Sequence, residues 1–251
     1  MMPPTTLIFG GSGKVARHLT RLLVSQGSAV HSVIRNPSQL SEISDLGAQP
    51  IVQSIEEASV DDLAQTIKRC NPDVVVWSAG AGGGSPERTQ TVDKEGAIKS
   101  FDATAQAGVK RYIIVSAIDV RDRENKPVPD WYNEDDRNRS DRVWGAIGVY
   151  MRAKFAADRD LVTNNAMRDL DYTIIRPGGL SQDPGKGTIA AGKVHLGAMI
   201  SREDVAAAIV AAMSEPKTIG LAIDMVGGDV PIEEAVRKVA EQKLNSFEGY
   251  Y

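Results

Sequence analysis

Short apolar segments alternate with helical patterns along nearly the whole chain. Seven of these segments have the length and the Val and Ile content of strands that are buried on both faces of a parallel sheet. They are residues 5–9, 29–34, 49–53, 73–78, 111–116, 172–176 and 221–225. Helical patterns connect or follow them at residues 13–26, 60–69, 91–107, 147–167, 202–213 and 232–244. This alternation predicts an α/β fold with a doubly wound parallel sheet of the Rossmann type.

The bulk properties favour one soluble domain. The length of 251 residues suits a single α/β domain, and no linker rich in Pro, Gly or Ser divides the chain, so we expect one domain over residues 1–251. A net charge of −4 excludes a general affinity for nucleic acid or anionic membranes, and no apolar run is long enough to span a bilayer. Cys70 is the single cysteine, and the start of the chain lacks the pattern of a signal peptide. We therefore expect a cytoplasmic protein, as a monomer or a homodimer.

A glycine-rich loop, FGGSGKVA, lies between the first predicted strand and the first predicted helix. A helix start leaves backbone N–H groups without partners, and a phosphate can reach them only where side chains are small. Gly10 and Gly13 leave that space, Ser12 adds a hydroxyl donor, and Lys14 and Val15 begin the helix. The alternative is a tight turn that binds nothing. The position between a strand and a helix is the one that a dinucleotide-binding fingerprint requires, so we predict a bound nucleotide.

The charge after the second predicted strand indicates which dinucleotide binds. NAD-selective sites usually have Asp or Glu there, to accept hydrogen bonds from the ribose. Here the strand is followed by Arg35 and Asn36, with no carboxylate in this segment. A guanidinium can pair with the 2′-phosphate of NADP, and Lys14 is expected to approach the same phosphate. Two surface cations without a ligand are the alternative; we predict NADP(H).

Three residues suggest carbonyl chemistry. Ser116 ends the fifth predicted strand, and Tyr150 and Lys154 are four residues apart on one face of the following helix. An ammonium beside a phenol lowers its pKa and makes it a proton donor and acceptor near neutrality. Ser116 would hydrogen-bond the reacting carbonyl oxygen. The Tyr-x-x-x-Lys pattern also occurs by chance, as a half-buried tyrosine beside a solvated lysine.

Other segments are assigned less directly. The glycine run after the fourth predicted strand, with Ala79, Gly80 and Ala81, is expected to form a wall of the cofactor site. The three histidines have no metal-ligand spacing, so no metal site is predicted. Residues 119–142 hold 14 charged residues in 24 and are interpreted as a solvated, mobile insertion outside the core. The alternative is a lid with Trp131 or Tyr132 as its apolar contact.

The sequence resembles the atypical short-chain dehydrogenase/reductases, within the NAD(P)H-binding proteins that include NmrA-like and biliverdin-reductase-B-like members, with a fungal character. The motifs that carry the resemblance are FGGSGKVA, RNP, VDKEGAIKSFDATAQAGVKRYIIVSA, YMRAKFAAD and LDYTIIRPGGLSQDPGKG. The resemblance implies that the segment after the sixth strand passes the nicotinamide, at residues Pro177, Gly178, Gly179 and Leu180. It also implies that Ser54 and Ile55 lie near the adenine, although relatives often have aspartate at the position of Ser54.

We therefore predict an NADPH-dependent oxidoreductase that reduces a carbonyl or a similar unsaturated small molecule. Its substrate region would be a small one built from loops, residues 119–142 and 178–193. One alternative is a regulator that binds NADP without catalysis and senses the redox state. The other is an isomerase, epimerase or dehydratase that uses bound nicotinamide transiently.

Overall fold

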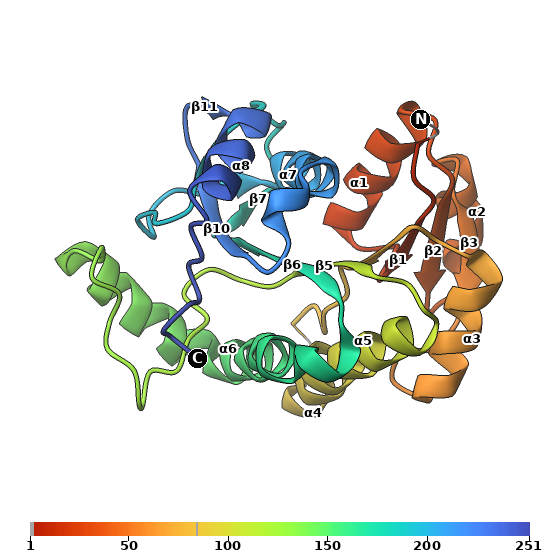
Figure 1. Ribbon diagram of the computed structural model, residues 1–251, viewed down its shortest axis with the longest axis horizontal. Coiled ribbons are helices and arrows are strands. Elements are labelled where there is room, and N and C mark those ends of the chain that lie inside the picture. The colour runs from red at the N-terminus through yellow and green to blue at the C-terminus, as the bar shows by residue number, and fades with distance from the viewer. Residues whose placement is uncertain (1–2, 84) are drawn as a thin grey trace.

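A nine-stranded sheet runs through the protein, in the order β11-β8-β10-β6-β5-β4-β1-β2-β3 (Figure 1). The computed structural model describes residues 3–83 and 85–251, so Met1, Met2 and the Gly84 of the glycine run lie outside the described residues. The strands are β1 (Thr6–Phe9), β2 (Val30–Ile34), β3 (Gln49–Val52), β4 (Val74–Trp77), β5 (Arg111–Val115), β6 (Asp171–Pro177), β8 (Thr188–Ala191), β10 (Ala222–Gly227) and β11 (Val230–Pro231).

The predicted parallel sheet is confirmed. The strands from β3 to β10 in this order pair in parallel, and the seven predicted strands match them within two residues at each end. Two antiparallel strands, β8 and β11, extend the sheet at one edge, and β7 (Leu180–Ser181) pairs with β9 (Ile200–Ser201) in a separate ribbon. The prediction lacked these four strands because they have only two to four residues and no apolar run.

Helices cover both faces of the sheet. Helices α1, α7 and α8 lie on one face, and α3, α5 and α6 lie on the other (Figure 1). The helices are α1 (Lys14–Ser25), α2 (Leu40–Asp45), α3 (Val60–Cys70), α4 (Pro86–Thr89), α5 (Ala97–Gln106), α6 (Glu134–Arg168), α7 (Arg202–Ser214) and α8 (Ile232–Glu241). None of the helices within the described ranges has both the length and the apolar character needed to cross a bilayer.

Two predicted helices differ from the observed ones. The helix predicted over 91–107 begins as a π-helix, η2 (Gln90–Gly96), and continues as α5. The helix predicted from residue 147 is the second half of α6, which begins at Glu134. Ile147 has non-helical backbone angles (φ −128°, ψ 31°), so α6 is two helical segments joined at a kink. The first segment was missed because its residues are mostly charged and show no apolar stripe.

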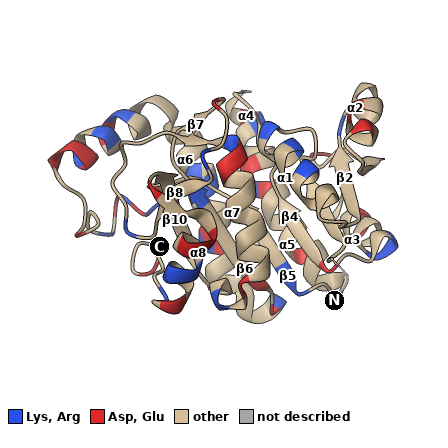
Figure 2. Cartoon of the chain, turned by 90° about the horizontal axis from the view of Figure 1, so that it is seen from above, with Lys and Arg blue, Asp and Glu red and all other residues tan. Residues whose placement is uncertain are grey.

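Residues 119–142 are only partly a solvated insertion, so the expectation that they lie outside the core is wrong. Val120 is fully buried, and Asp119 and Arg121 are 2% and 3% exposed. Their charges are paired: Arg121 Nε donates to Asp119 Oδ1 at 2.9 Å, and Ser140 Oγ donates to Asp119 Oδ2 at 2.6 Å. Buried charges need such partners. The first half of α6 still extends from the body with its acidic and basic residues intermixed on its surface (Figure 2).

Candidate active site

The N-terminus of α1 is left open for a ligand. Helices α3, α6 and α7 begin with the capping side chains of Ser59, Asn133 and Ser201. Helix α1, whose N-cap residue is Gly13, has no capping side chain, and neither have α2, α5 and α8. The first turn of α1 also lacks acidic residues. Among the described residues no side chain caps the N–H groups of this first turn, so these groups and the positive end of the helix dipole form the arrangement that binds a phosphate.

The glycines before α1 allow the loop to pass close to its neighbours. Gly10 has φ +78°, and a Cβ built on it would lie 2.6 Å from the Cα of Ala79. A Cβ on Gly11 would lie 2.5 Å from Cβ of Ser32. Part of the glycine content thus serves the packing of the loop against the ends of β2 and β4. Gly13 is the glycine whose missing side chain exposes the helix start.

Two hollows meet beside the predicted catalytic residues. A cleft of about 740 Å³, the glycine-loop cleft, is lined by Gly13, Lys14, Val15, Ala79, Gly80 and Ala81 together with Lys154. A second hollow of about 380 Å³, the apolar cavity, is lined by Pro177, Gly178 and Gly179 and by residues of α6. Ser116, Ile147, Tyr150 and Leu180 line both the cleft and the cavity. A molecule in the apolar cavity would therefore reach one in the cleft at these four side chains.

Lys154 lies beneath the Tyr150 ring and is held by buried acceptors. Its Nζ lies 5.8 Å from the centre of the Tyr150 ring, donates to the carbonyl oxygen of Val115 at 3.2 Å, and pairs with Asp93 Oδ1 at 3.2 Å. Lys154 is 3% exposed and Asp93 is fully buried. Asp93 also accepts a hydrogen bond from the N–H of Ala81 at 2.9 Å, so one carboxylate fixes both the lysine and the loop after β4.

The pKa values of Tyr150 and Lys154 are both higher than the ordinary values of these groups. Burial raises the pKa of the Tyr150 phenol, and Lys154 offsets only part of this rise. Burial by itself would lower the pKa of Lys154, but Tyr150 and Asp93 together outweigh it, so the net shift is upward. The expectation of a lowered tyrosine pKa is therefore wrong for the protein without ligand. At neutral pH the phenol holds its proton and the lysine is an ammonium.

Ser116 contacts a carboxylate that the sequence analysis overlooked. Its Oγ donates to Asp158 Oδ2 at 2.6 Å, and Asp158 is fully buried. Burial raises the pKa of Asp158 to about 6, although Arg176, Ser116 and Lys154 act to lower it. While Asp158 is ionised, Ser116 directs its proton to this carboxylate and away from the cavity. The signal was present: Asp158 follows Lys154 by four residues and shares its helix face.

Arg35, Asn36 and Ile55, three of the residues predicted for the adenosine end, lie around a third hollow of about 260 Å³, the β2-end cavity. It is lined by Gly10, Ser12, Gly13, Arg35, Asn36, Ile55, Ala79 and Gly80. Ser54 is not among its lining residues, and its Oγ accepts a hydrogen bond from the N–H of Glu57 at 3.3 Å. Lys14 lines the glycine-loop cleft and not this cavity, so the expectation that Lys14 and Arg35 share one phosphate is not supported.

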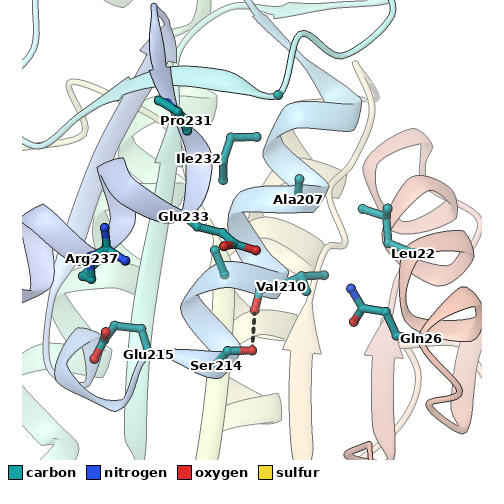
Figure 3. A pocket seen from close by; sticks show the side chains of 12 residues that line it. Leu22, Gln26, Ala207, Val210, Ser214, Glu215, Pro231, Ile232, Glu233 and Arg237 are labelled. Carbon is teal, nitrogen blue, oxygen red and sulfur yellow. Dashed lines mark hydrogen bonds between the residues drawn. The ribbon is translucent and has the colours of Figure 1, made fainter.

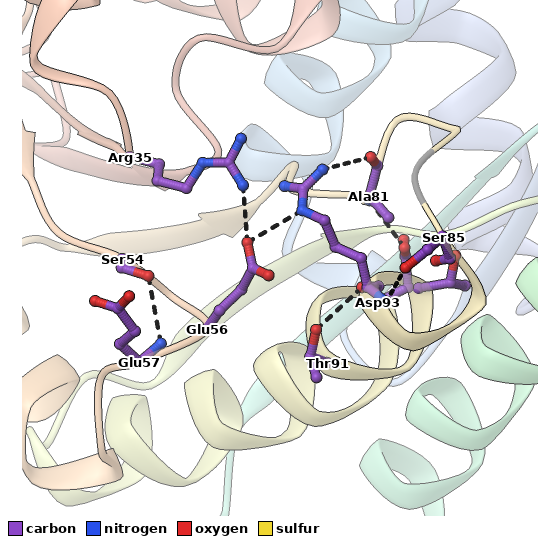
Figure 4. Close-up of polar contacts among 10 residues, drawn as sticks. Arg35, Ser54, Glu56, Glu57, Ala81, Ser85, Thr91 and Asp93 are labelled. Carbon is purple, nitrogen blue, oxygen red and sulfur yellow. Dashed lines mark hydrogen bonds and ion pairs between the residues drawn. The ribbon is translucent and has the colours of Figure 1, made fainter.

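A carboxylate does lie at the tip of β2. Glu56, from the loop between β3 and α3, lies with its Oε1 2.9 Å from Arg35 Nη1 and 3.2 Å from Arg88 Nε (Figure 4). The prediction that no carboxylate lies at this tip holds for the residues that directly follow β2. It is wrong for the folded protein, in which Glu56 reaches the tip from another loop. Neither Glu56 nor Arg88 gave a signal in the sequence, because both come from other parts of the chain.

Residues 119–142 form one wall of the apolar cavity. Asp119, Arg139 and Ser140 line it, together with Leu196 and neighbouring residues. Asp136 links this wall to a second one, the segment after β8, because it accepts the N–H of Leu196 at 2.7 Å and pairs with His195 Nδ1 at 2.6 Å. The expected contact through Trp131 or Tyr132 is not found. Neither lines the cavity, and Trp131 packs edge-on against both Tyr132 and Tyr250.

Another hollow, of about 610 Å³, lies between α1, α7 and α8 (Figure 3). Leu22, Ala207 and Val210 line it with Ser214 and Arg237. None of the predicted site residues contributes to it, and it does not reach the N-terminus of α1. Its volume is similar to that of the glycine-loop cleft, but its lining has neither the glycine loop nor the predicted catalytic residues.

A family model described as NAD(P)H-binding matches residues 10–216. The chain belongs to this NAD(P)H-binding family. The match begins at the first glycine of the loop and extends past the segment that follows β6.

Individual relatives match most of the length of this chain. UPF0659 protein C216.03 of Schizosaccharomyces pombe is 41% identical over 231 residues and is matched over 92% of each chain. Uncharacterized sugar epimerase YhfK of Bacillus subtilis is 34% identical over 92% of this chain and 98% of its own. The oxidoreductase ylbE from Lactococcus lactis superimposes with a TM-score of 0.77 at 25% identity, over 94% of this chain and 97% of its own. A fungal relative therefore exists.

Proposed function

We propose that this protein is an NADPH-dependent oxidoreductase that reduces a carbonyl or a similar unsaturated group of a small molecule. The observation that carries the proposal is the position of Ser116, Tyr150 and Lys154. Ser116 and Tyr150 lie where the glycine-loop cleft meets the apolar cavity, and Lys154 lies beneath the tyrosine ring. We also propose that residues 1–251 act as a single domain, of the atypical short-chain dehydrogenase/reductase subgroup named above.

The residues around the glycine loop fit a dinucleotide. The uncapped start of α1 at Gly13 suits the diphosphate, and the β2-end cavity with Arg35 suits the adenosine end. Leu180, which lines both the glycine-loop cleft and the apolar cavity, would lie beside the nicotinamide. Bound nicotinamide supplies the hydride.

The side chains of this chain would handle the proton. The Tyr150 phenol is protonated at neutral pH, since its pKa lies above an ordinary value of 10.0, so it can donate to the oxygen of a carbonyl in the apolar cavity. The ammonium of Lys154 then stabilises the phenolate that remains. Asp93 and the carbonyl of Val115 keep this ammonium in place. The raised pKa makes the phenol a weaker acid, so proton transfer depends on this ammonium to stabilise the phenolate as it forms.

The test is the substitution Tyr150→Phe. We expect it to leave NADPH affinity nearly unchanged and to lower turnover about 10²–10⁴-fold, the usual effect of losing a proton donor. The measurement is NADPH oxidation against a panel of aldehydes, ketones and conjugated enones, with NADPH titrated by fluorescence. Lys154→Met should weaken both binding and turnover, since the ammonium also faces the cleft. Wild-type turnover by the Tyr150→Phe variant would refute the mechanism.

An epimerase or dehydratase is the second candidate, and the name of the Bacillus subtilis relative favours it. A sugar substrate needs many hydrogen-bonding partners, whereas the apolar cavity is lined largely by residues such as Val143, Ile147 and Met199. The lining therefore favours a substrate with an apolar body. An epimerase would leave the absorbance of NADPH at 340 nm unchanged over many turnovers, whereas a reductase would consume one NADPH per product. A regulator without catalysis would show no turnover at all.

A further inference from the structure

Three charged side chains from three different segments meet at the end of β2. Arg35 follows β2, Glu56 lies in the loop after β3, and Arg88 belongs to α4, which follows β4. Both guanidinium groups contact the same oxygen, Oε1 of Glu56, at 2.9 and 3.2 Å (Figure 4). Arg88 is further fixed by its Nη1, which donates to the carbonyl oxygen of Ala81 at 2.7 Å.

This cluster belongs to the β2-end cavity. Arg35, Glu56 and Arg88 all line it, and Gly13, Ala79 and Gly80 connect it to the glycine-loop cleft. A dinucleotide whose diphosphate lies at the start of α1 would thus place the hydroxyls of its adenosine ribose near these three side chains.

The carboxylate of Glu56 lies between two guanidinium groups, in the position that a bound phosphate would take. A carboxylate between two guanidinium groups uses the same donors that a phosphate monoester uses. The side chain of Glu56 is 27% exposed and that of Arg35 is 58% exposed, so both can move without unpacking the core. The cluster carries two positive charges and one negative charge, and it gains an open site for a dianion only when Glu56 turns away.

We propose that Glu56 is a specificity-determining residue that sets the preference between NADPH and NADH, and that Arg88 is a second cation for the 2′-phosphate. With NADH, Glu56 stays between the arginines and accepts a hydrogen bond from the 2′-hydroxyl. With NADPH, the 2′-phosphate displaces the carboxylate from both guanidinium groups. This inference rests on the proposed cofactor binding, and it makes Glu56 a competitor of the phosphate within the same site.

The test uses the adenosine halves of the cofactors, which are not turned over. Adenosine 2′,5′-bisphosphate and adenosine 5′-monophosphate are titrated calorimetrically into the wild type, Glu56→Gln, Arg88→Met and the matched control Glu57→Gln. Glu57 is the exposed neighbour, and its side chain does not line the cavity. Glu56→Gln should bind the bisphosphate about fivefold more tightly and the monophosphate several-fold more weakly. Arg88→Met should bind the bisphosphate about tenfold more weakly, and the control should match the wild type.

Each result of these titrations either supports or overturns the proposal. If Glu56→Gln binds the bisphosphate as the wild type does, or more weakly, Glu56 is not a competitor of the phosphate and the inference is overturned. Unchanged bisphosphate affinity in Arg88→Met overturns the role of Arg88. A wild type that binds neither probe overturns both the inference and the proposed cofactor site. Failure of the proposed reductase activity is separate, since it would show as no NADPH oxidation while both probes still bind.

Discussion

Asp158 is a residue whose protonation affects both stability and the site. Burial raises its pKa to about 6 in the folded protein, against an ordinary value near 3.8. Between these two values the folded state binds a proton that the unfolded state does not. The free energy of unfolding therefore falls as pH rises through this window, and the full penalty remains above it.

The substitution Asp158→Asn tests this effect. Asparagine can still accept the hydrogen bond of Ser116 but does not titrate. We expect the unfolding free energy of the wild type, taken relative to that of the variant, to be about 1 kcal/mol higher at pH 5 than at pH 7.5. Urea denaturation of both proteins at the two pH values measures it. A difference that does not change with pH, or that grows as pH rises, would show that Asp158 is ionised in the folded protein throughout.

At the scale of elements, the start of α6 and the segment after β8 depend on one carboxylate. Asp136 completes the capping box with Asn133, accepts the N–H of Leu196, and pairs with His195. Burial would raise the pKa of Asp136, but the hydrogen bonds from His195 and from these backbone groups outweigh it and lower the pKa. The carboxylate is thus ionised at neutral pH and holds two walls of the apolar cavity together.

Asp136→Ala should loosen both elements at once. Loss of a capping side chain costs about 0.5–2 kcal/mol, and one of the released N–H groups belongs to Leu196, which lines the cavity. We expect faster hydrogen exchange at the start of α6 and at residues 195–199 together, with the sheet unchanged. Asp135→Ala is the matched control, because Asp135 is exposed on the same turn. Faster exchange in one of the two segments alone would mean that they are not coupled through Asp136.

At the scale of the whole molecule, the parts that the sequence predicted well are those with local signals. The apolar runs gave the parallel strands, and the four-residue spacing placed Tyr150 and Lys154 on one helix face. The parts that were missed depend on residues far apart in the chain. Glu56 reaches Arg35 only because β3 lies beside β2, and the buried acid beneath Lys154, Asp93, comes from a π-helix after β4. Pairing of this kind has no sequence periodicity.

The open start of α1 predicts a conflict between stability and binding for the whole protein. Gly13 occupies the N-cap position, where Asp or Asn is ordinarily preferred, and a Cβ there would lie 3.1 Å from the carbonyl oxygen of Gly10, which must shift by a few tenths of an ångström. Gly13→Asp should raise the unfolding free energy without cofactor by about 0.5–1 kcal/mol, because the carboxylate caps the helix and complements its dipole.

The same substitution should abolish stabilisation by cofactor, since the new carboxylate would lie where the diphosphate binds. NADPH at a hundred times its Kd should stabilise the wild type by about 2.7 kcal/mol and raise its melting temperature by about 5–10 °C. We expect almost no rise for Gly13→Asp at the same NADPH concentration. Gly13→Asn is the control, since it caps the helix and has the same size without the charge, so it should retain more of the rise. Differential scanning fluorimetry of the three proteins measures this, and an equal rise in Gly13→Asp and the wild type would mean that the diphosphate does not bind at the start of α1.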